Sequence, residues 1–153
     1  MKTEYFKKRL SSLCVLVLIL AILTGCASKT MGLSTFADIV QEKSYLVTDA
    51  SGSAPGIKIW KVARLVEKNA NIQYVEFEGD GQANKFYSNE VQNLKNLTGS
   101  NGSSNAGSFT LTDRNYYYQI MKKGKYVIYG TCPATYSSEM KDIMAKIGEL
   151  EVK

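Results

Sequence analysis

Among the side chains that carry enzymatic chemistry, this chain has three cysteines and fourteen carboxylates but no histidine. Without histidine, a Ser-His-Asp or Cys-His arrangement for activating a nucleophile is impossible, and zinc has no imidazole ligand. A cysteine thiol would need a lysine, an arginine or a helix N-terminus to become reactive. The sequence therefore excludes hydrolases and metalloenzymes that depend on histidine.

The carboxylates offer one arrangement of interest, in the segment EFEGDGQ. Glu76 and Glu78 would share one face of a strand, with Asp80 just beyond. Two carboxylates with raised pKa values are the chemistry of a hydrolase acting on envelope polymers, which is kept as an alternative function. The spacing matches no calcium loop, and Asp80 stands where a helix N-cap belongs. We therefore expect no catalytic residue here, no metal and no cofactor.

The first two cysteines belong to an N-terminal segment with its own pattern. The apolar run from Leu13 to Leu23 is eleven residues long, whereas a helix needs about 20 to span a bilayer. A basic segment precedes the run, and the small residues Thr24 and Gly25 follow it. This order of basic, apolar and small residues is typical of a secretory signal peptide.

The four residues Leu23-Thr24-Gly25-Cys26 resemble the lipobox of bacterial lipoproteins. The resemblance implies that residues 1–25 are a signal peptide that is removed, and that Cys26 becomes the first residue of the mature chain. In that family the cysteine thiol carries a diacylglyceryl group, with fatty acids such as palmitate. The resemblance also implies attachment to the extracytoplasmic side of the cell membrane. The alternative is an ordinary cleavage site or an uncleaved anchor.

Removal of residues 1–25 changes the composition that matters for function. It leaves 128 residues and takes away four basic residues and one acidic residue, so the formal charge falls from +5 to +2. Such a chain lacks the basic surface expected of a nucleic-acid-binding domain, and we expect no nucleic-acid partner. With Cys26 acylated, only Cys132 remains as a free thiol, so no intrachain disulfide is expected.

The remaining pattern predicts a single α+β domain over residues 34–153, after a lipidated cysteine and tether at 26–33. Helical periodicity predicts helices beginning at Ser34, near Asp80 and near Ser137. Residues rich in β-branched and aromatic side chains predict strand pairs at 57–79 and 115–130, and a short extended piece is expected from Tyr45. The alternative at 59–66 is a helix, because Ile59, Val62 and Val66 could share one helical face. The expected order is α-β-β-α-β-β-α, with an antiparallel sheet of about four strands and helices mainly on one face. The segment 98–108, rich in Gly, Ser and Asn, is expected to be a mobile loop.

The strongest hairpin signal is NYYYQIMKKGKYVIYG, with a turn at Lys123-Gly124. This turn predicts that Ile120 lies opposite Val127, and that Tyr118 lies opposite Tyr129. The three lysines around it could contact anionic lipid headgroups. Cys132, just after the hairpin, is either a reactive thiol or a small buried side chain.

Half of the ten tyrosines fall in this hairpin. On a strand, Tyr116 and Tyr118 share one face and Tyr117 takes the other. Aromatic rings that carry phenol groups suit ligands that are part apolar and part polar, such as sugars or peptides. The alternative is that tyrosine is simply a favoured strand residue. The candidate binding face consists of Tyr116, Tyr117, Tyr118, Tyr126 and Tyr129.

The element order, with Tyr136-x-x-Glu139 and Gly148 in the last helix, is similar to that of small uncharacterised lipoproteins of Gram-positive bacteria. That resemblance implies no known activity. The expected function is a non-enzymatic, membrane-anchored module that binds an envelope protein or glycan. An inhibitory or accessory subunit of a neighbouring membrane protein is a further alternative.

Overall fold

The computed structural model of the protein describes residues 29–50, 55–98 and 102–152. The helices in these residues are α2 (Leu33–Gln41), α3 (Asp80–Thr98) and α4 (Ser137–Gly148). The strands are β1 (Leu46–Asp49), β2 (Ile57–Leu65), β3 (Ala70–Phe77), β4 (Ser103–Asn105), β5 (Ser108–Asp113), β6 (Tyr116–Lys123) and β7 (Tyr126–Pro133). The predicted signal peptide and Cys26 lie outside the described residues. Within the described ranges, no helix is both long enough and apolar enough to span a membrane.

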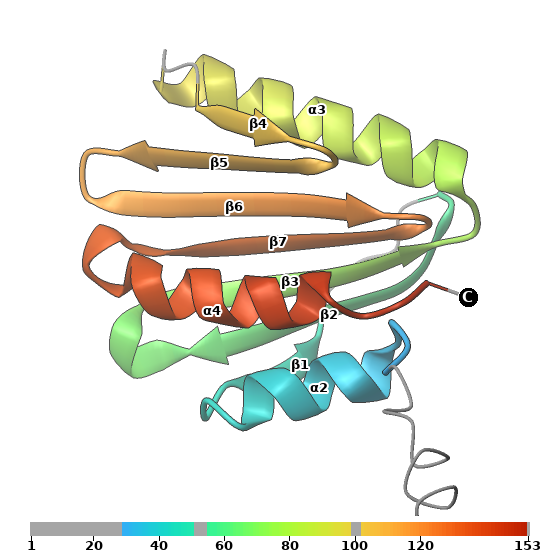
Figure 1. The fold of residues 1–153 in the computed structure, drawn as a ribbon, viewed down its shortest axis with the longest axis horizontal. Helices are drawn as coiled ribbons and strands as arrows, with labels where there is room; N and C mark the ends of the chain where they lie inside the picture. Colours follow the sequence, from blue (N-terminus) through green and yellow to red (C-terminus); the bar gives the residue numbers. More distant parts are fainter. Residues whose placement is uncertain (1–28, 51–54, 99–101, 153) are drawn as a thin grey trace, which may run out of the picture.

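The seven strands form one antiparallel sheet in the order β1-β2-β3-β7-β6-β5-β4 (Figure 1). The α+β class and the antiparallel sheet are therefore confirmed, and the two predicted strand pairs are β2 with β3 and β6 with β7. The predictions of about four strands and of the order α-β-β-α-β-β-α are wrong. The observed order is α-β-β-β-α-β-β-β-β-α, because β4 and β5 were not predicted and the short extended piece at β1 was not counted as a strand of the sheet.

Strand β4 shows why the mobile loop predicted at 98–108 is wrong in part. Ser103 and Asn105 pair with Thr110 and Ser108 of β5, although all three β4 side chains are exposed. Backbone N–H and C=O groups pair whatever side chain they carry, so a short polar segment can form an edge strand. The remaining part of that prediction, residues 99–101, lies outside the described residues.

Side chains alternate along the strands, so each face of the sheet has its own apolar core. Helices α2 and α4 pack on one face over the α2/α4 core, which contains Phe36, Tyr74 and Ile128. Helix α3 packs on the opposite face over the α3 core, which contains Phe109 and Val127. In Figure 1, α4 crosses in front of the sheet and α3 lies behind β4. The helices are thus mainly, but not all, on one face.

The apolar stripe of the last helix is confirmed. Four of its predicted members lie on one side of α4 at spacings of three and four residues, and the fifth, Leu150, follows the end of the helix and is buried in the same α2/α4 core. Each is no more than 4% exposed. These residues are Met140, Ile143, Met144, Ile147 and Leu150.

The register of the β6–β7 hairpin differs from the predicted one by two residues. Ile120 pairs with Tyr129 and Tyr118 pairs with Thr131, so the predicted partners are wrong. The turn consists of Gly124 and Lys125, because Lys123 already pairs with Tyr126. Gly124 has a φ of 56°, the left-handed conformation that favours glycine at the first position of a two-residue hairpin turn. A shift of two residues leaves every side chain on its predicted face.

The first described residues are part of the fold rather than a free tether. The Met31 N–H donates to the Glu151 carbonyl at 2.7 Å, and the Glu151 N–H donates to the Lys29 carbonyl at 3.1 Å. The Met31 side chain is buried in the α2/α4 core. Residues 29–32, which the sequence assigned to the tether, therefore belong to the domain.

Candidate functional site

The five candidate tyrosines lie on both faces of the sheet. Tyr117 and Tyr126 are buried in the α2/α4 core, 2% and 7% exposed. Tyr118 and Tyr129 are half-buried on the opposite face, and Tyr116 on that face is 39% exposed. The alternation predicted from the sequence therefore separates them into a core pair and a surface group of three.

The surface tyrosines border a part of the sheet that α3 leaves open. Helix α3 packs mainly over β3, β5, β6 and β7. Beyond it, side chains from β1, β2 and β3 line a shallow hollow of about 480 Å³. We call this surface, together with the three tyrosines, the open sheet face. Its members are Thr48, Trp60, Val62, Arg64, Asn71, Gln73, Tyr116, Tyr118 and Tyr129, and Asp49 and Ala50 at the end of β1 also line the hollow.

Cross-strand pairing makes the open sheet face continuous. Val62 pairs with Gln73, and Gln73 pairs with Tyr129, which forms one row across three strands. Arg64 pairs with Asn71 in the neighbouring row, whose continuation through β7 reaches Tyr118. Directly opposite side chains lie about 5 Å apart. A ligand laid across the strands would therefore meet polar and aromatic groups in succession.

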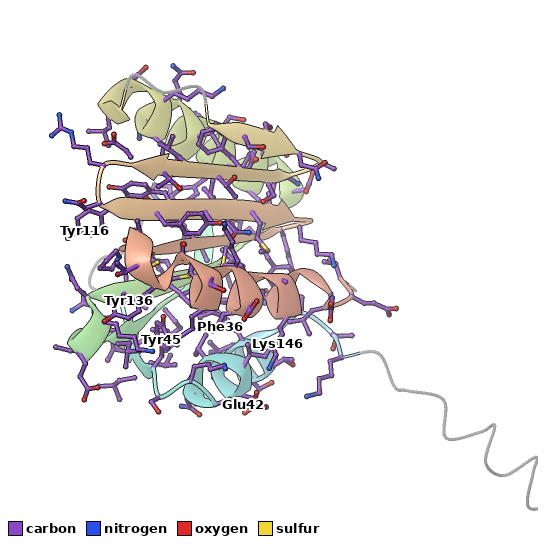
Figure 2. All side chains as sticks on the ribbon, turned by 60° about the vertical axis from the view of Figure 1, so that its left-hand side comes forward. Phe36, Glu42, Tyr45, Tyr116, Tyr136 and Lys146 are labelled. Atoms are coloured by element: carbon purple, nitrogen blue, oxygen red, sulfur yellow. The ribbon has the colours of Figure 1, made fainter. Side chains whose placement is uncertain are left out.

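Polar contacts hold several of these groups in place. The Trp60 indole N–H donates to the Gln73 side-chain oxygen at 3.1 Å, and the Asn69 amide donates to the Tyr116 phenol oxygen at 3.1 Å. The rings of Tyr116 and Tyr118 lie with centroids 6.4 Å apart. Figure 2 places Tyr116 at the end of the molecule that also carries Tyr136. The aromatic rings are thus oriented without any ligand.

The electrostatics of the open sheet face are nearly neutral. Two exposed charged residues, Arg64 and Asp49, line the hollow, and their charges are opposite. Burial, together with the nearby Glu90 carboxylate on α3, raises the pKa of Tyr129 to about 12. Its phenol therefore remains protonated and able to donate a hydrogen bond throughout the physiological range.

Six of the nine members were not predicted from the sequence: Thr48, Trp60, Val62, Arg64, Asn71 and Gln73. The available signal was the alternation of polar Asn71 and Gln73 with apolar Ile72 and Tyr74 on β3. This alternation indicates that one face of β3 meets solvent. It does not indicate which neighbouring strands extend that solvent-facing surface.

The carboxylates proposed for the hydrolase alternative do not form a pair. Glu76 is 7% exposed and lies 2.9 Å from the Lys125 amine and 3.4 Å from the Lys58 amine. Burial raises the pKa of Glu76, but the hydrogen bond and charge of Lys125, with those of Lys58, outweigh it and lower the pKa overall. Glu78 is exposed and lies beyond the end of β3. A glycosidase acid needs a raised pKa, so Glu76 does not suit that role.

Glu76 does make a pH-dependent contribution to stability that can be measured. Its folded-state pKa lies below the ordinary value of 4.5, so this contribution is present above pH 4.5 and is lost as pH falls through the folded pKa. We expect Glu76→Gln to lower the free energy of unfolding by about 1 kcal/mol at pH 7. In urea unfolding at pH 3, the difference from the parent protein should shrink. Exposed Glu78→Gln is the control, and a loss at Glu76 that is independent of pH would contradict the expectation.

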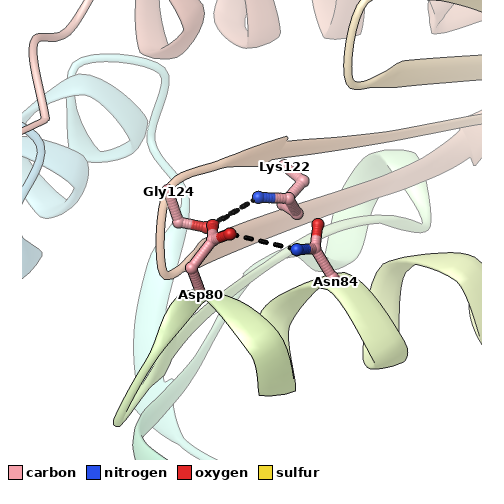
Figure 3. A network of polar contacts seen from close by, with 4 residues as sticks. All are labelled: Asp80, Asn84, Lys122 and Gly124. Carbon is pink, nitrogen blue, oxygen red and sulfur yellow. Dashed lines mark hydrogen bonds and ion pairs between the residues drawn. The ribbon is translucent and has the colours of Figure 1, made fainter.

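The three lysines of the hairpin are engaged within the fold. The Lys122 amine lies 2.6 Å from the Asp80 carboxylate and 3.1 Å from the Gly124 carbonyl, and Asn84 donates to the same carboxylate (Figure 3). Lys123 donates to carbonyls at the end of α4, and Lys125 pairs with Glu76. These contacts compete with the predicted role of the lysines at lipid headgroups. Asp80 is the first residue of α3, and its carboxylate binds Lys122.

Cys132 is a fully buried member of the α2/α4 core. Burial, with a smaller effect of the nearby Glu139 carboxylate, raises the pKa of its thiol to about 11. The thiol is therefore protonated and shielded, which favours the structural alternative over the reactive one. No cluster of three or more Cys, Asp and Glu side chains able to hold a metal occurs within the described ranges.

The open sheet face is thus the part of the described chain with the properties of a binding surface. It combines flat aromatic rings with amide, hydroxyl and guanidinium groups, a combination that suits ligands of mixed polarity. It brings together no acid and base in positions for catalysis. The chain matches no protein-family model, no curated protein and no solved structure, so a functional assignment rests on this geometry.

Proposed function

We propose that this protein is a bacterial lipoprotein attached through Cys26 to the extracytoplasmic side of the cell membrane, and that its domain is a non-enzymatic binding module. The observation that supports the binding role is the open sheet face, where Trp60 and three tyrosines border polar side chains left uncovered by α3. A protein that needed no ligand would gain stability by covering this surface.

The anchor is supported by the sequence and by where the fold begins. The lipobox ends at Cys26, and Lys29, the first residue that the structure describes, is already paired within the domain. A diacylglyceryl cysteine carries two acyl chains, which turn marginal membrane binding into stable anchoring. The chain thus passes from the proposed anchor into the domain almost at once.

The chemistry of the open sheet face favours a neutral envelope glycan. Sugar rings present apolar C–H faces that stack on aromatic rings, and hydroxyl groups that pair with planar amides. Trp60, Gln73 and Tyr129 supply both kinds of group on adjacent strands. Arg64 and Asp49 carry opposite charges, so the surface has no net charge with which to select a highly charged polymer.

Trp60 is the only tryptophan in the sequence, so its fluorescence reports directly on this surface. We expect soluble peptidoglycan fragments or chitin oligosaccharides to shift the Trp60 emission saturably in the purified acylated protein in detergent. Arg64→Ala or Gln73→Ala should weaken binding by about five-fold or more, which corresponds to about 1 kcal/mol. Lys43→Ala, which removes an equal charge from the α2/α4 side, should leave binding unchanged.

An unchanged emission with every glycan would contradict the glycan assignment. Crosslinking in intact cells then tests the remaining alternative, an accessory or inhibitory subunit. A stable adduct with a membrane protein, lost on substitution of Arg64, would show that the open sheet face binds a protein partner instead of a glycan.

A further inference from the structure

The point where the chain joins the fold lies at one end of the sheet. Lys29 and Met31 pair with Glu151. A Cβ atom placed on Gly124, in the β6–β7 turn, would come within 2.9 Å of the neighbouring Val152 side chain. The start of the described chain, its C-terminal residues and the β6–β7 turn therefore lie together, on the right of Figure 1.

Other elements reach the same end of the sheet. The Lys122 N–H donates to the Gly107 carbonyl of the β4–β5 turn at 2.7 Å, and its amine binds Asp80 at the start of α3. Lys123 donates to the carbonyl of Gly148 at the end of α4. We call this end, formed by the two turns, the start of α3 and the end of α4, the anchor end.

The length of chain before the anchor end is short. Only Ala27 and Ser28 separate Cys26 from Lys29. Three steps of about 3.8 Å between consecutive Cα atoms give a maximum reach of ~11 Å. Because the acyl chains of Cys26 would be buried in the hydrocarbon of the bilayer, Lys29 is held at the level of the lipid headgroups.

We infer that the domain stands with its anchor end against the bilayer, so that the strands rise from the membrane and the open sheet face is presented sideways to the envelope. This inference rests on the proposed acylation of Cys26. The opposite end, with the β5–β6 turn and the start of α4, then lies about one strand length higher. For the eight residues of β6, that length is ~26 Å.

Nothing on the outer side of α2 and α4 favours a flat orientation instead. The exposed residues there alternate in sign, with Asp38, Glu42 and Asp142 near Lys43 and Lys146. Lys146 already pairs with Glu42 across the two helices at 3.5 Å, and Figure 2 shows these residues facing each other. A mixed surface without an apolar patch has little attraction for anionic lipid. The short tether therefore decides the orientation.

Helix α4 runs toward the anchor end, so positions along it can report their distance from the bilayer. Three of its exposed positions and its C-cap residue lie on one side, because they follow spacings of four, three and four residues. The first and last are eleven residues apart, which corresponds to ~16 Å along the axis. They are Ser138, Asp142, Ala145 and Glu149.

The experiment places a fluorophore on a cysteine introduced at each position of the purified acylated protein, one at a time. Native Cys132 is buried and should stay unlabelled. The protein is reconstituted in vesicles of phosphatidylcholine and phosphatidylglycerol that contain a lipid with a nitroxide on its headgroup. We expect quenching to rise steadily from Ser138→Cys to Glu149→Cys, several-fold in total. Four positions keep the gradient measurable if one variant fails to fold.

The outcomes separate this inference from the proposed function. Uniform quenching in protein that sediments with the vesicles would show a flat orientation, and stronger quenching at Ser138→Cys would show an inverted one. Either result overturns the inference and leaves the anchor in place. Acylated protein that fails to sediment with the vesicles would overturn the anchor, and the orientation with it.

Discussion

Replacing Cys26 by serine should release the protein from the membrane fraction. A serine hydroxyl does not take the place of the thiol that would receive the diacylglyceryl group, so both acyl chains are lost together. The described domain offers no membrane-spanning helix to compensate. Each buried CH₂ contributes about 0.8 kcal/mol to membrane binding, so the loss of two chains removes stable anchoring. Immunoblots of fractionated cells should show at least about a ten-fold fall in the pellet-to-supernatant ratio.

Cys14→Ser is the matched control, because it makes the same substitution in the segment predicted to be removed. It should leave the distribution of the protein unchanged. A Cys26→Ser protein that stays in carbonate-washed membranes at the parental level would contradict the proposed anchor. Mass spectrometry of the parent protein should also find an acylated N-terminus that begins at Cys26.

The parts of the fold that were predictable from the sequence are those with strong periodicity. Met140, Ile143 and Ile147 recur at helical spacing and all face one core. The β6–β7 hairpin was identified by its glycine turn, but its register was wrong by two residues. Strand pairing is decided by which backbone groups face each other, and a turn of Lys123-Gly124 or Gly124-Lys125 fits the sequence equally well.

The two edge strands, β1 and β4, and the neighbouring strand β5 were less predictable. Strand β5 does alternate, with Phe109 and Leu111 buried, but it follows directly on a segment of small polar residues. Strand β4 has no apolar side chain at all, so only its pairing with β5 defines it. Strand β1 is four residues long, and its Leu46 is 68% exposed. Strands β1 and β4 lack the buried alternating side chains from which a strand is predicted. Strand β5 has them, but the polar residues just before it obscure where the strand begins.

The candidate site was predictable in one respect and not in another. Alternation correctly placed Tyr116 and Tyr118 on one face and Tyr117 on the other. Which part of the sheet stays open depends on where α3 packs. The sequence does not predict this position, because several apolar side chains of α3 are only partly buried, as at Phe86 and Tyr87, or exposed, as at Leu97. The contribution of Trp60 and Gln73 depends on the sheet order, because β3 meets β7 only in the folded structure.

Tyr117→Ala should unfold the domain far more easily than Tyr116→Ala, although the two residues are neighbours on β6. Tyr117 is 2% exposed in the α2/α4 core. Its hydroxyl donates to Gln119 at 2.8 Å, and the Lys141 amine lies 5.2 Å from its ring centre. Truncating a buried aromatic side chain removes its transfer free energy and leaves a cavity, at a cost of about 3–5 kcal/mol. Total stabilities are about 5–15 kcal/mol, so the loss is a large share.

Tyr116 supplies the matched comparison, because the same truncation occurs on the other face of the same strand. Its ring is more than a third exposed and its phenol accepts one hydrogen bond from Asn69, so Tyr116→Ala should cost less than about 1 kcal/mol. Urea unfolding followed by circular dichroism measures both. Tyr117→Phe should lie between them, since it removes only the hydroxyl. Equal losses at the two alanine variants would mean that both faces of β6 are packed alike, and Tyr116 would then have no place in a binding surface.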